Sequence, residues 1–218
     1  MVLKIYGFPA STCTRRVALV CEEVGVPYEL VVVNISKGEQ KTSTFLEHQP
    51  FGVVPYIVDQ DGYELYESRA IGRYLATKHS SPLIPSPTDV KKWGKFEQAA
   101  SIEQSNFDAF ALNIATERVF KPAKGLAGDE ALAQRYTEAL KAKIDVYEVI
   151  LSKQKYLAGE ECTLADLFHL PYGALITKIG INFLEDDITR PHVARWWKDI
   201  TSRPSWLKVK DGVPLPSQ

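Results

Sequence analysis

The sequence lacks the long apolar run that a membrane span requires. No stretch of its 218 residues approaches the roughly 20 apolar residues of a transmembrane helix, so we expect no membrane insertion. The first residues, Met1 to Phe8, also lack the basic and apolar regions of a signal peptide, and they have the pattern of a strand instead. These absences predict a protein of the cytoplasm.

Cysteine is scarce, and neither sign of charge is in excess. The three cysteines, Cys13, Cys21 and Cys162, are odd in number and are not spaced as metal ligands, so we expect a reducing compartment and no metal site. The 26 basic residues are scattered among 27 acidic ones, which gives a formal net charge of −1. This balance argues against nucleic acid or an anionic membrane as a partner.

The residues at the N-terminus have the pattern of a strand, a helix and a second strand. Leu3 and Ile5 alternate with more polar neighbours, as in a strand. A helical spacing of apolar residues follows and stops at Gly25, where we expect a left-handed cap. The β-branched run from Tyr28 to Val33 predicts a second strand, parallel to the first.

A hairpin and another helix come next. Residues 53–58 and 63–65 read as two strands, because the polar turn Asp59–Gln60–Asp61–Gly62 separates them. The helical period returns from Ser68. The order βαβ-ββα is that of a thioredoxin-like domain, so residues 1–79 are expected to form an α/β domain with a mixed four-stranded sheet.

The rest of the sequence is helical in pattern. Residues 80–87 carry three prolines among serines and are expected to be a linker. Residues 88–218 show apolar residues at spacings of three or four, which predicts an all-α helical bundle. Thr163 and Asp166 have the spacing of a capping box. The tail from Ser205 onward is expected to lie along the surface.

The turn before the first helix is the candidate for chemistry. A helix N-terminus offers free N–H groups and a partial positive charge, so it stabilises an anion, including a thiolate. Ser11 stands at that turn and has a hydroxyl that can donate to the same sulfur. The alternative is that Ser11 or Thr14 only caps the helix, which is a common role of Ser and Thr there.

Several motifs in chain order decide between these readings. Each motif is weak alone, but together they span nearly the whole sequence, and the chain resembles the phi class of serine-type glutathione transferases. The motifs are Pro9–Ala10–Ser11–Thr12 with Arg15–Arg16, Gly38–Glu39–Gln40–Lys41, Gln49–Pro50–Phe51–Gly52, Glu67–Ser68–Arg69–Ala70–Ile71, Phe107–Asp108, Phe120–Lys121–Pro122, Gly125–Leu126 and Arg203–Pro204–Ser205–Trp206.

The resemblance implies an enzyme that conjugates reduced glutathione to hydrophobic electrophiles and also reduces organic hydroperoxides. Ser11 would stabilise the glutathione thiolate. Glutathione would be a co-substrate, no cofactor would be tightly bound, and the protein would be a homodimer. The alternative is a ligandin, which carries hydrophobic ligands with weak or no catalysis. The resemblance leaves the physiological electrophile open.

The resemblance also implies where each end of glutathione binds. Glu67 would pair with the ammonium group, and Ser68, as the cap of its helix, would hold the γ-glutamyl carboxylate. Lys41 and Gln40 would hold the glycine carboxylate.

The cysteinyl part would bind the backbone at Val54–Pro55, whose peptide bond is expected to be cis by resemblance. The glutathione site would also include Val53, where phi-class proteins generally carry Gln. Because valine cannot donate a hydrogen bond from its side chain, we predict a retained but weaker affinity for glutathione.

The second substrate is expected to lie against aromatic side chains of the helical domain and the loop around Ile35. The residues expected in this pocket are Ile35, Phe107, Phe110 and Phe120. By the same resemblance, Phe51 would insert into the neighbouring subunit of the dimer. A thiol reductase is a further alternative, but that chemistry requires a cysteine at the position of Ser11. Cys13, two residues later, is expected to have a packing role.

Overall fold

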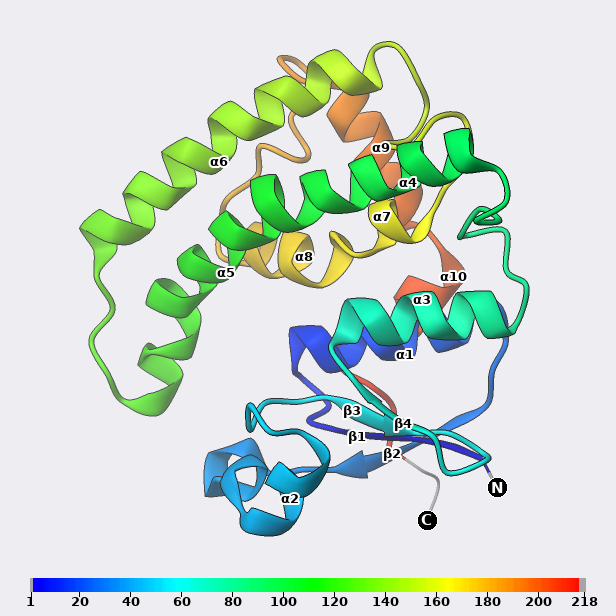
Figure 1. Cartoon of the computed structure of the whole chain (residues 1–218). Coiled ribbons are helices and arrows are strands. Elements are labelled where there is room, and N and C mark those ends of the chain that lie inside the picture. Colours follow the sequence, from blue (N-terminus) through cyan, green and yellow to red (C-terminus); the bar gives the residue numbers. More distant parts are fainter. Residues whose placement is uncertain (1, 216–218) are drawn as a thin grey trace. The chain divides into compact units, whose positions relative to one another are not determined.

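The computed structural model describes residues 2–215, which form two compact units (Figure 1). Unit 1 comprises the described residues of Met1–Ile84 and Arg203–Gln218, and unit 2 is Pro85–Ser202. The chain passes from unit 1 to unit 2 within residues 80–87, which the sequence predicts to be a linker.

Unit 1 contains a mixed four-stranded sheet in the order β2-β1-β3-β4. Strands β1 and β2 are parallel, whereas β3 runs antiparallel to β1 and to β4. This arrangement confirms the thioredoxin-like fold expected from the sequence. The strands are β1 (Leu3–Gly7), β2 (Tyr28–Val32), β3 (Tyr56–Val58) and β4 (Glu64–Tyr66).

Two helices, α1 (Thr12–Val24) and α3 (Ser68–Lys78), lie side by side on one face of this sheet (Figure 1). Leu3 and Ile5 are fully buried, because alternate side chains of β1 point toward this face. Gly25 ends α1 with φ 71°, and its N–H donates to the carbonyl of Cys21, so the predicted left-handed cap is confirmed.

A short helix between β2 and β3 is missing from the sequence prediction. After the turns η1 (Ile35–Lys37) and η2 (Glu39–Lys41), residues Ser43–His48 form α2, and the hydroxyl of Thr42 accepts from the N–H of Phe45. Phe45 is the only buried residue of α2, and its ring packs edge-on against Tyr56 of β3. One buried residue in six gives too little hydrophobic periodicity to reveal a helix in the sequence.

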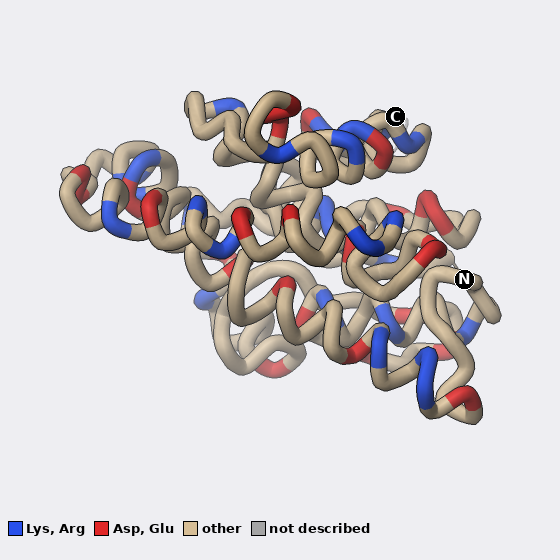
Figure 2. The backbone as a smooth tube through the Cα atoms, turned by 90° about the horizontal axis from the view of Figure 1, so that it is seen from above, with Lys and Arg blue, Asp and Glu red and all other residues tan. Residues whose placement is uncertain are grey.

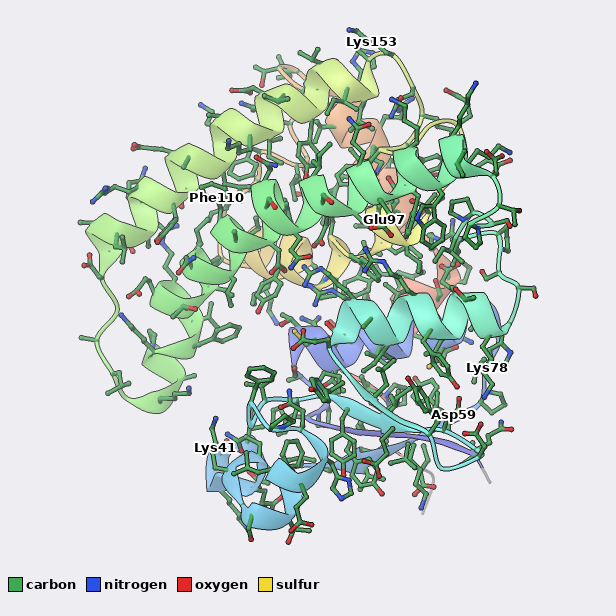
Figure 3. The ribbon with its side chains drawn as sticks, in the orientation of Figure 1. Lys41, Asp59, Lys78, Glu97, Phe110 and Lys153 are labelled. Atoms are coloured by element: carbon green, nitrogen blue, oxygen red, sulfur yellow. The ribbon has the colours of Figure 1, made fainter. Side chains whose placement is uncertain are left out.

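A carboxylate at the hairpin turn fixes the far end of the sheet to α3. Asp59 accepts hydrogen bonds from Lys78 Nζ at 2.7 Å and from the Tyr74 hydroxyl at 2.5 Å. Burial raises the pKa of Asp59, but these hydrogen bonds outweigh burial and hold it below its ordinary value. Figure 3 shows Asp59 and Lys78 together at the end of the sheet opposite Lys41.

The C-terminal residues differ from the sequence prediction. Residues 203–215 belong to unit 1 and not to the helical domain expected over 88–218, and Pro204–Val209 form α10, which packs on α1. Trp206 and Val213 are 3% exposed, so this segment is part of the core and not a surface tail. Residues 216–218 of that predicted tail lie outside the described residues.

An ion pair fastens this segment to α1. Arg203 donates two hydrogen bonds of 2.6 Å to the carboxylate of Glu23, and Ser205 donates a third. Burial raises the pKa of Glu23, but the donors outweigh it and hold the pKa below its ordinary value. Such a carboxylate stabilises the fold above its unfolded pKa, about 4.3, and the contribution disappears as the pH falls through the lower folded value.

We therefore expect Glu23→Gln to lower the free energy of unfolding by about 2 kcal/mol at neutral pH. The difference from wild type should shrink as the pH falls below about 4, where wild-type Glu23 also loses its charge. Urea unfolding at several pH values measures both quantities. The control is Glu22→Gln, because Glu22 pairs with Lys208, which is 61% exposed, and should contribute less than about 1 kcal/mol. Equal losses in the two variants would contradict this account of Glu23.

Unit 2 is a bundle of helices, as the sequence predicts (Figure 1). Its core contains Phe96, Leu140 and Trp196, each at most 1% exposed. The helices are α4 (Val90–Glu103), η3 (Gln104–Asp108), α5 (Ala109–Ala115), η4 (Thr116–Phe120), η5 (Pro122–Lys124), α6 (Glu130–Leu151), α7 (Leu164–Leu167), α8 (Leu170–Lys178) and α9 (Pro191–Thr201).

A buried carboxylate joins three segments of unit 2. Asp166 is fully buried and accepts from the backbone N–H groups of Leu157 and Thr163 and from the indole nitrogen of Trp196. Thr163 and Asp166 form both hydrogen bonds of the predicted capping box, which is confirmed. Asp166 thus ties the start of α7 to the preceding loop and to α9.

Charged residues of both signs are interspersed along the backbone of each unit, as Figure 2 shows. This pattern agrees with the net charge of −1. None of the helices within residues 2–215 combines the length and the hydropathy needed to span a membrane.

Candidate functional site

Ser11 occupies the N-cap of α1, directly after the turn that ends β1. Its backbone is extended, with φ −64° and ψ 130°, and its hydroxyl oxygen accepts from the N–H of Thr14 at 3.3 Å. The side chain therefore caps the helix. A hydroxyl has one hydrogen to donate and two lone pairs, so accepting from Thr14 leaves the hydrogen of Ser11 available to a ligand. Capping and ligand binding are compatible at this residue.

Close packing holds the first turn of α1 against the end of β1. Thr14 is fully buried, and a Cβ atom at Gly7 would lie 2.6 Å from its side chain. Only glycine permits this approach. The position of Ser11 relative to the sheet is therefore fixed by the packing of the first turn of its helix.

The C-terminal segment also contacts this turn and the first helical residues after it. The N–H of Val213 donates to the carbonyl of Pro9 at 3.0 Å. Arg15 donates to the carbonyl of Lys210 at 2.5 Å, and its guanidinium lies 5.7 Å from the ring centroid of Trp206. Sequence reasoning missed these contacts, because nearly 200 residues separate Arg15 from Lys210 and no local pattern reports such a distance.

A second helix N-terminus in unit 1, that of α3, presents Glu67 and Ser68. Glu67 is the N-cap, with φ 71° and ψ 105°, and Ser68 is the first helical residue. The expectation that Ser68 caps the helix is therefore wrong by one position. Among the described residues, the Glu67 side chain makes no capping hydrogen bond, so the first turn of α3 lacks this internal partner for its N–H groups.

A buried arginine connects the two helix starts. Arg16, in the second turn of α1, is fully buried and donates to the hydroxyl oxygen of Ser68 at 2.9 Å. The same nitrogen lies 3.4 Å from the sulfur of Cys13. Sequence reasoning placed Arg16 in the Ser11 motif without giving it a role. The sequence did contain a signal that Arg16 is buried, because this charged residue stands within the apolar stripe of its helix.

Lys41 lies against the loop that precedes β3. Its Nζ atom donates to the carbonyl of Phe51 at 3.2 Å, and a Cβ atom at Gly52 would lie 2.8 Å from Lys41 Cδ and Nζ. The side-chain oxygen of Gln40 is buried without a partner among the described residues. The structure thus brings the predicted glycine-carboxylate residues to the loop that carries Val53.

The peptide bond between Val54 and Pro55 is cis, as expected. Pro55 is buried and directly precedes β3, whereas the side chain of Val53 is 49% exposed. Val53 therefore presents an apolar surface at this point of the loop.

The residues predicted for the second substrate have different environments. Phe107 is fully buried and packs against His169 with 4.7 Å between ring centroids. Phe110 is half-buried beside Tyr136 on α6, and Phe120 is also half-buried. These phenylalanines belong to unit 2, whereas Ile35, which is half-buried, belongs to unit 1.

Two π-helical turns interrupt the long helical stretch of residues 90–120. They are η3 and η4, and they contain Phe107 and Phe120 respectively. Single π-helical turns inside α-helices occur frequently at functional sites, because the extra residue redirects the side chains that follow. Sequence reasoning missed both turns, since one inserted residue changes the hydrophobic period too little to be recognised.

Two domain profiles match the sequence. The glutathione S-transferase N-terminal domain matches residues 1–77, and the glutathione S-transferase C-terminal domain matches residues 107–204. Glutathione S-transferase PM239X14 from Arabidopsis thaliana is 50% identical over 200 residues, which cover 90% of each chain.

Solved structures show the same similarity. Glutathione transferase F7 from Populus trichocarpa superposes with a TM-score of 0.90 at 36% identity, covering 98% of this chain and 100% of that one. Glutathione S-transferase I from maize, solved in complex with an atrazine glutathione conjugate, has a TM-score of 0.87 at 33% identity, with 96% of each chain covered. The chain therefore belongs to the glutathione S-transferase family and falls among its phi-class members.

Proposed function

We propose that the protein conjugates reduced glutathione to hydrophobic electrophiles, with Ser11 holding the glutathione thiolate. The observation that carries this proposal is the Ser11 hydroxyl at the N-terminus of α1, which accepts from Thr14 and keeps its hydrogen for a ligand. A sulfur atom placed there meets one hydroxyl donor and the positive end of a 13-residue helix. Both favour the thiolate over the thiol.

The reaction needs no covalent intermediate with the protein. The thiol of glutathione loses its proton to solvent, and the sulfur lone pair forms a bond to the electrophilic carbon while the leaving group departs with its electron pair. The same thiolate can attack the outer oxygen of an organic hydroperoxide, so that an S–O bond forms, the O–O bond breaks and the alkoxide leaves as the alcohol. A second glutathione then converts the sulfenic acid to glutathione disulfide and water, and we therefore extend the proposal to peroxide reduction. Cys13 takes no part, because Ser11 and not Cys13 stands at the helix cap.

The γ-glutamyl end of glutathione is proposed to bind at the start of α3. Its carboxylate would accept from the hydroxyl and the N–H of Ser68, since the first N–H groups of a helix have no intrahelical acceptor. The carboxylate of Glu67, which is exposed, would pair with the ammonium group.

The glycine and cysteinyl parts are proposed to bind the loop before β3. Lys41 would hold the glycine carboxylate, and Gln40 would assist it. The backbone of Val54 would exchange hydrogen bonds with the cysteinyl part, because the cis bond to Pro55 stands directly before the strand.

For the electrophile, we propose contacts with Phe110 and Phe120 of unit 2, which keep part of their surface exposed. Phe107 is fully buried against His169, so we propose that it supports the pocket from within unit 2. We place the enzyme in the cytoplasm, where its three cysteines would stay reduced.

Val53→Gln is expected to tighten glutathione binding about threefold to tenfold. The glutamine can donate a hydrogen bond to the γ-glutamyl end, which valine cannot, and an added hydrogen bond contributes roughly 0.5–1.5 kcal/mol. Calorimetric titration of both proteins with glutathione measures the effect. Val53→Leu is the control, since it enlarges the side chain without adding a donor. An unchanged affinity in Val53→Gln would refute this role of position 53.

Phe51→Ala is expected to weaken a homodimer. The side chain of Phe51 is 67% exposed, although its ring contacts Tyr66 edge-on, so it presents a large apolar surface that a second copy can cover. Sedimentation of wild type and variant over a range of concentrations reports the dissociation constant, which should rise at least about tenfold. Leu207→Ala is the control, because Leu207 is also exposed, at 52%. A variant that stays dimeric at the lowest concentration would argue against the role of Phe51.

The proposal is tested by mixing the purified protein with glutathione and a chlorodinitrobenzene and following the conjugate by absorbance. We expect enzymatic conjugation and, at glutathione 100-fold above its dissociation constant, about 2.7 kcal/mol of added stability. Stabilisation without conjugation would leave a carrier as the function. The absence of both would reject the proposal.

A further inference from the structure

We propose that Arg16 is a positioning residue that sets the recognition of the γ-glutamyl carboxylate through Ser68. The inference rests on the proposed function, because it concerns the glutathione site. It begins from a costly feature of unit 1, a fully buried guanidinium. Burying a charge is unfavourable unless hydrogen bonds satisfy it, and the hydroxyl of Ser68 is one of the partners that satisfy this guanidinium.

The contact between Arg16 and Ser68 decides the direction of the serine hydroxyl. Arg16 Nη1 donates to Ser68 Oγ at 2.9 Å, and a guanidinium carries donors only. The hydrogen of Ser68 therefore cannot point toward Arg16. It points elsewhere, and Ser68 is ready to donate to a carboxylate at the start of α3.

The charge of Arg16 acts in the same direction. A carboxylate oxygen that accepts from Ser68 would lie within about 6 Å of the guanidinium, since two hydrogen bonds in series separate them. At that distance a buried cation attracts an anion appreciably, and it polarises the hydroxyl between them. Arg16 thus favours a negatively charged group at Ser68 over a neutral one.

Arg16 also links the two ends of the proposed ligand site. It belongs to α1, whose cap is Ser11, and it contacts Ser68 at the start of α3. Its loss should therefore change the binding of the γ-glutamyl carboxylate specifically, while the thiol end keeps its hydroxyl and its helix.

The test compares two ligands on each protein. One is glutathione. The other is the analogue in which 4-aminobutanoyl replaces the γ-glutamyl group, so that the carboxylate is missing and the ammonium group remains. The quantity measured by calorimetry is the dissociation constant of the analogue divided by that of glutathione. This ratio does not depend on what fraction of a variant is folded.

For Arg16→Gln, we expect this ratio to fall at least about tenfold relative to wild type, because glutathione binding weakens while analogue binding hardly changes. In a Ser68→Ala background, Arg16→Gln should change the ratio much less, since the intermediate hydroxyl is gone. Arg16→Lys keeps the cation, and its ratio should lie between those of wild type and Arg16→Gln. If the Arg16→Gln protein does not fold, the ratio measured for Arg16→Lys tests the inference in its place.

The control is the neighbouring arginine. Arg15→Gln removes a donor to the Lys210 carbonyl and the contact with Trp206, so it should lower thermal stability and leave the ratio unchanged. Equal weakening of both ligands in the Arg16 variants would overturn the inference and show a purely structural role. A wild-type protein that binds neither ligand would instead reject the proposed function.

Discussion

Ser11→Ala is expected to lower kcat/KM for conjugation about 100-fold, equivalent to about 2.7 kcal/mol of lost transition-state stabilisation. The substitution removes the hydroxyl that donates to the sulfur, while the N-terminus of α1 remains. The KM for glutathione should change little, because the γ-glutamyl and glycine ends provide most of the binding contacts. Initial rates with a chlorodinitrobenzene, measured over a range of glutathione concentrations, separate kcat from KM.

The same substitution also removes a helix cap, so its effect on stability needs a control. Losing the hydrogen bond from Thr14 N–H to Ser11 Oγ should lower the free energy of unfolding by about 1 kcal/mol. Asp89→Ala makes a comparable change at the start of α4, where Asp89 accepts from the N–H of Lys92. We expect similar destabilisation in both variants but a loss of activity only in Ser11→Ala. An Ser11→Ala protein with activity within about threefold of wild type would exclude Ser11 as the donor.

Asp166→Ala is expected to lower the free energy of unfolding by about 4 kcal/mol or more. Asp166 is fully buried, and its removal leaves the N–H groups of Leu157 and Thr163 and the indole N–H of Trp196 without their acceptor. Each unsatisfied buried donor costs roughly 1–3 kcal/mol. For a chain of this size the melting temperature should fall by roughly 8–16 °C, which calorimetry or circular dichroism can measure.

Asp129→Ala is the matched control for that prediction. Asp129 is the N-cap of α6 and accepts from the N–H of Leu132, but it is exposed, so its loss should cost only about 1 kcal/mol. Asp166→Asn keeps the shape of the side chain and one acceptor oxygen, so its loss of unfolding free energy should lie between those of Asp129→Ala and Asp166→Ala. If Asp166→Ala were no more destabilising than Asp129→Ala, the buried network would have no special importance for the fold.

Elements with a strong local pattern could be predicted from the sequence. The parallel pair of strands, the hairpin and the glycine cap of α1 follow from alternation, β-branched runs and Gly25. The capping box at Thr163 also depends on residues three positions apart. In each case the deciding interaction is between near neighbours in the chain, and so the pattern is visible in the sequence.

Features set by distant contacts could not be predicted. The tail was expected on the surface, but Trp206 and Val213 are buried in unit 1 because they pack near the start of the chain. The positive φ of Glu67 shifted the start of α3 by one residue from the expected cap. The contact of Arg16 with Ser68 joins residues 52 positions apart. The residues of the candidate site were therefore named from motifs, whereas their connections required the structure.

The most direct test of the account is the pKa of the glutathione thiol in the complex, followed by the ultraviolet absorbance of the thiolate as the pH is varied. For the wild-type protein we expect a pKa about two units below that of a free thiol, which is about 8.5. In the complex with the Ser11→Ala protein, the pKa of the glutathione thiol should return most of the way to its value in free glutathione. A thiol that titrates in the wild-type complex as it does in water would contradict the central claim that Ser11 and the start of α1 stabilise the sulfur anion.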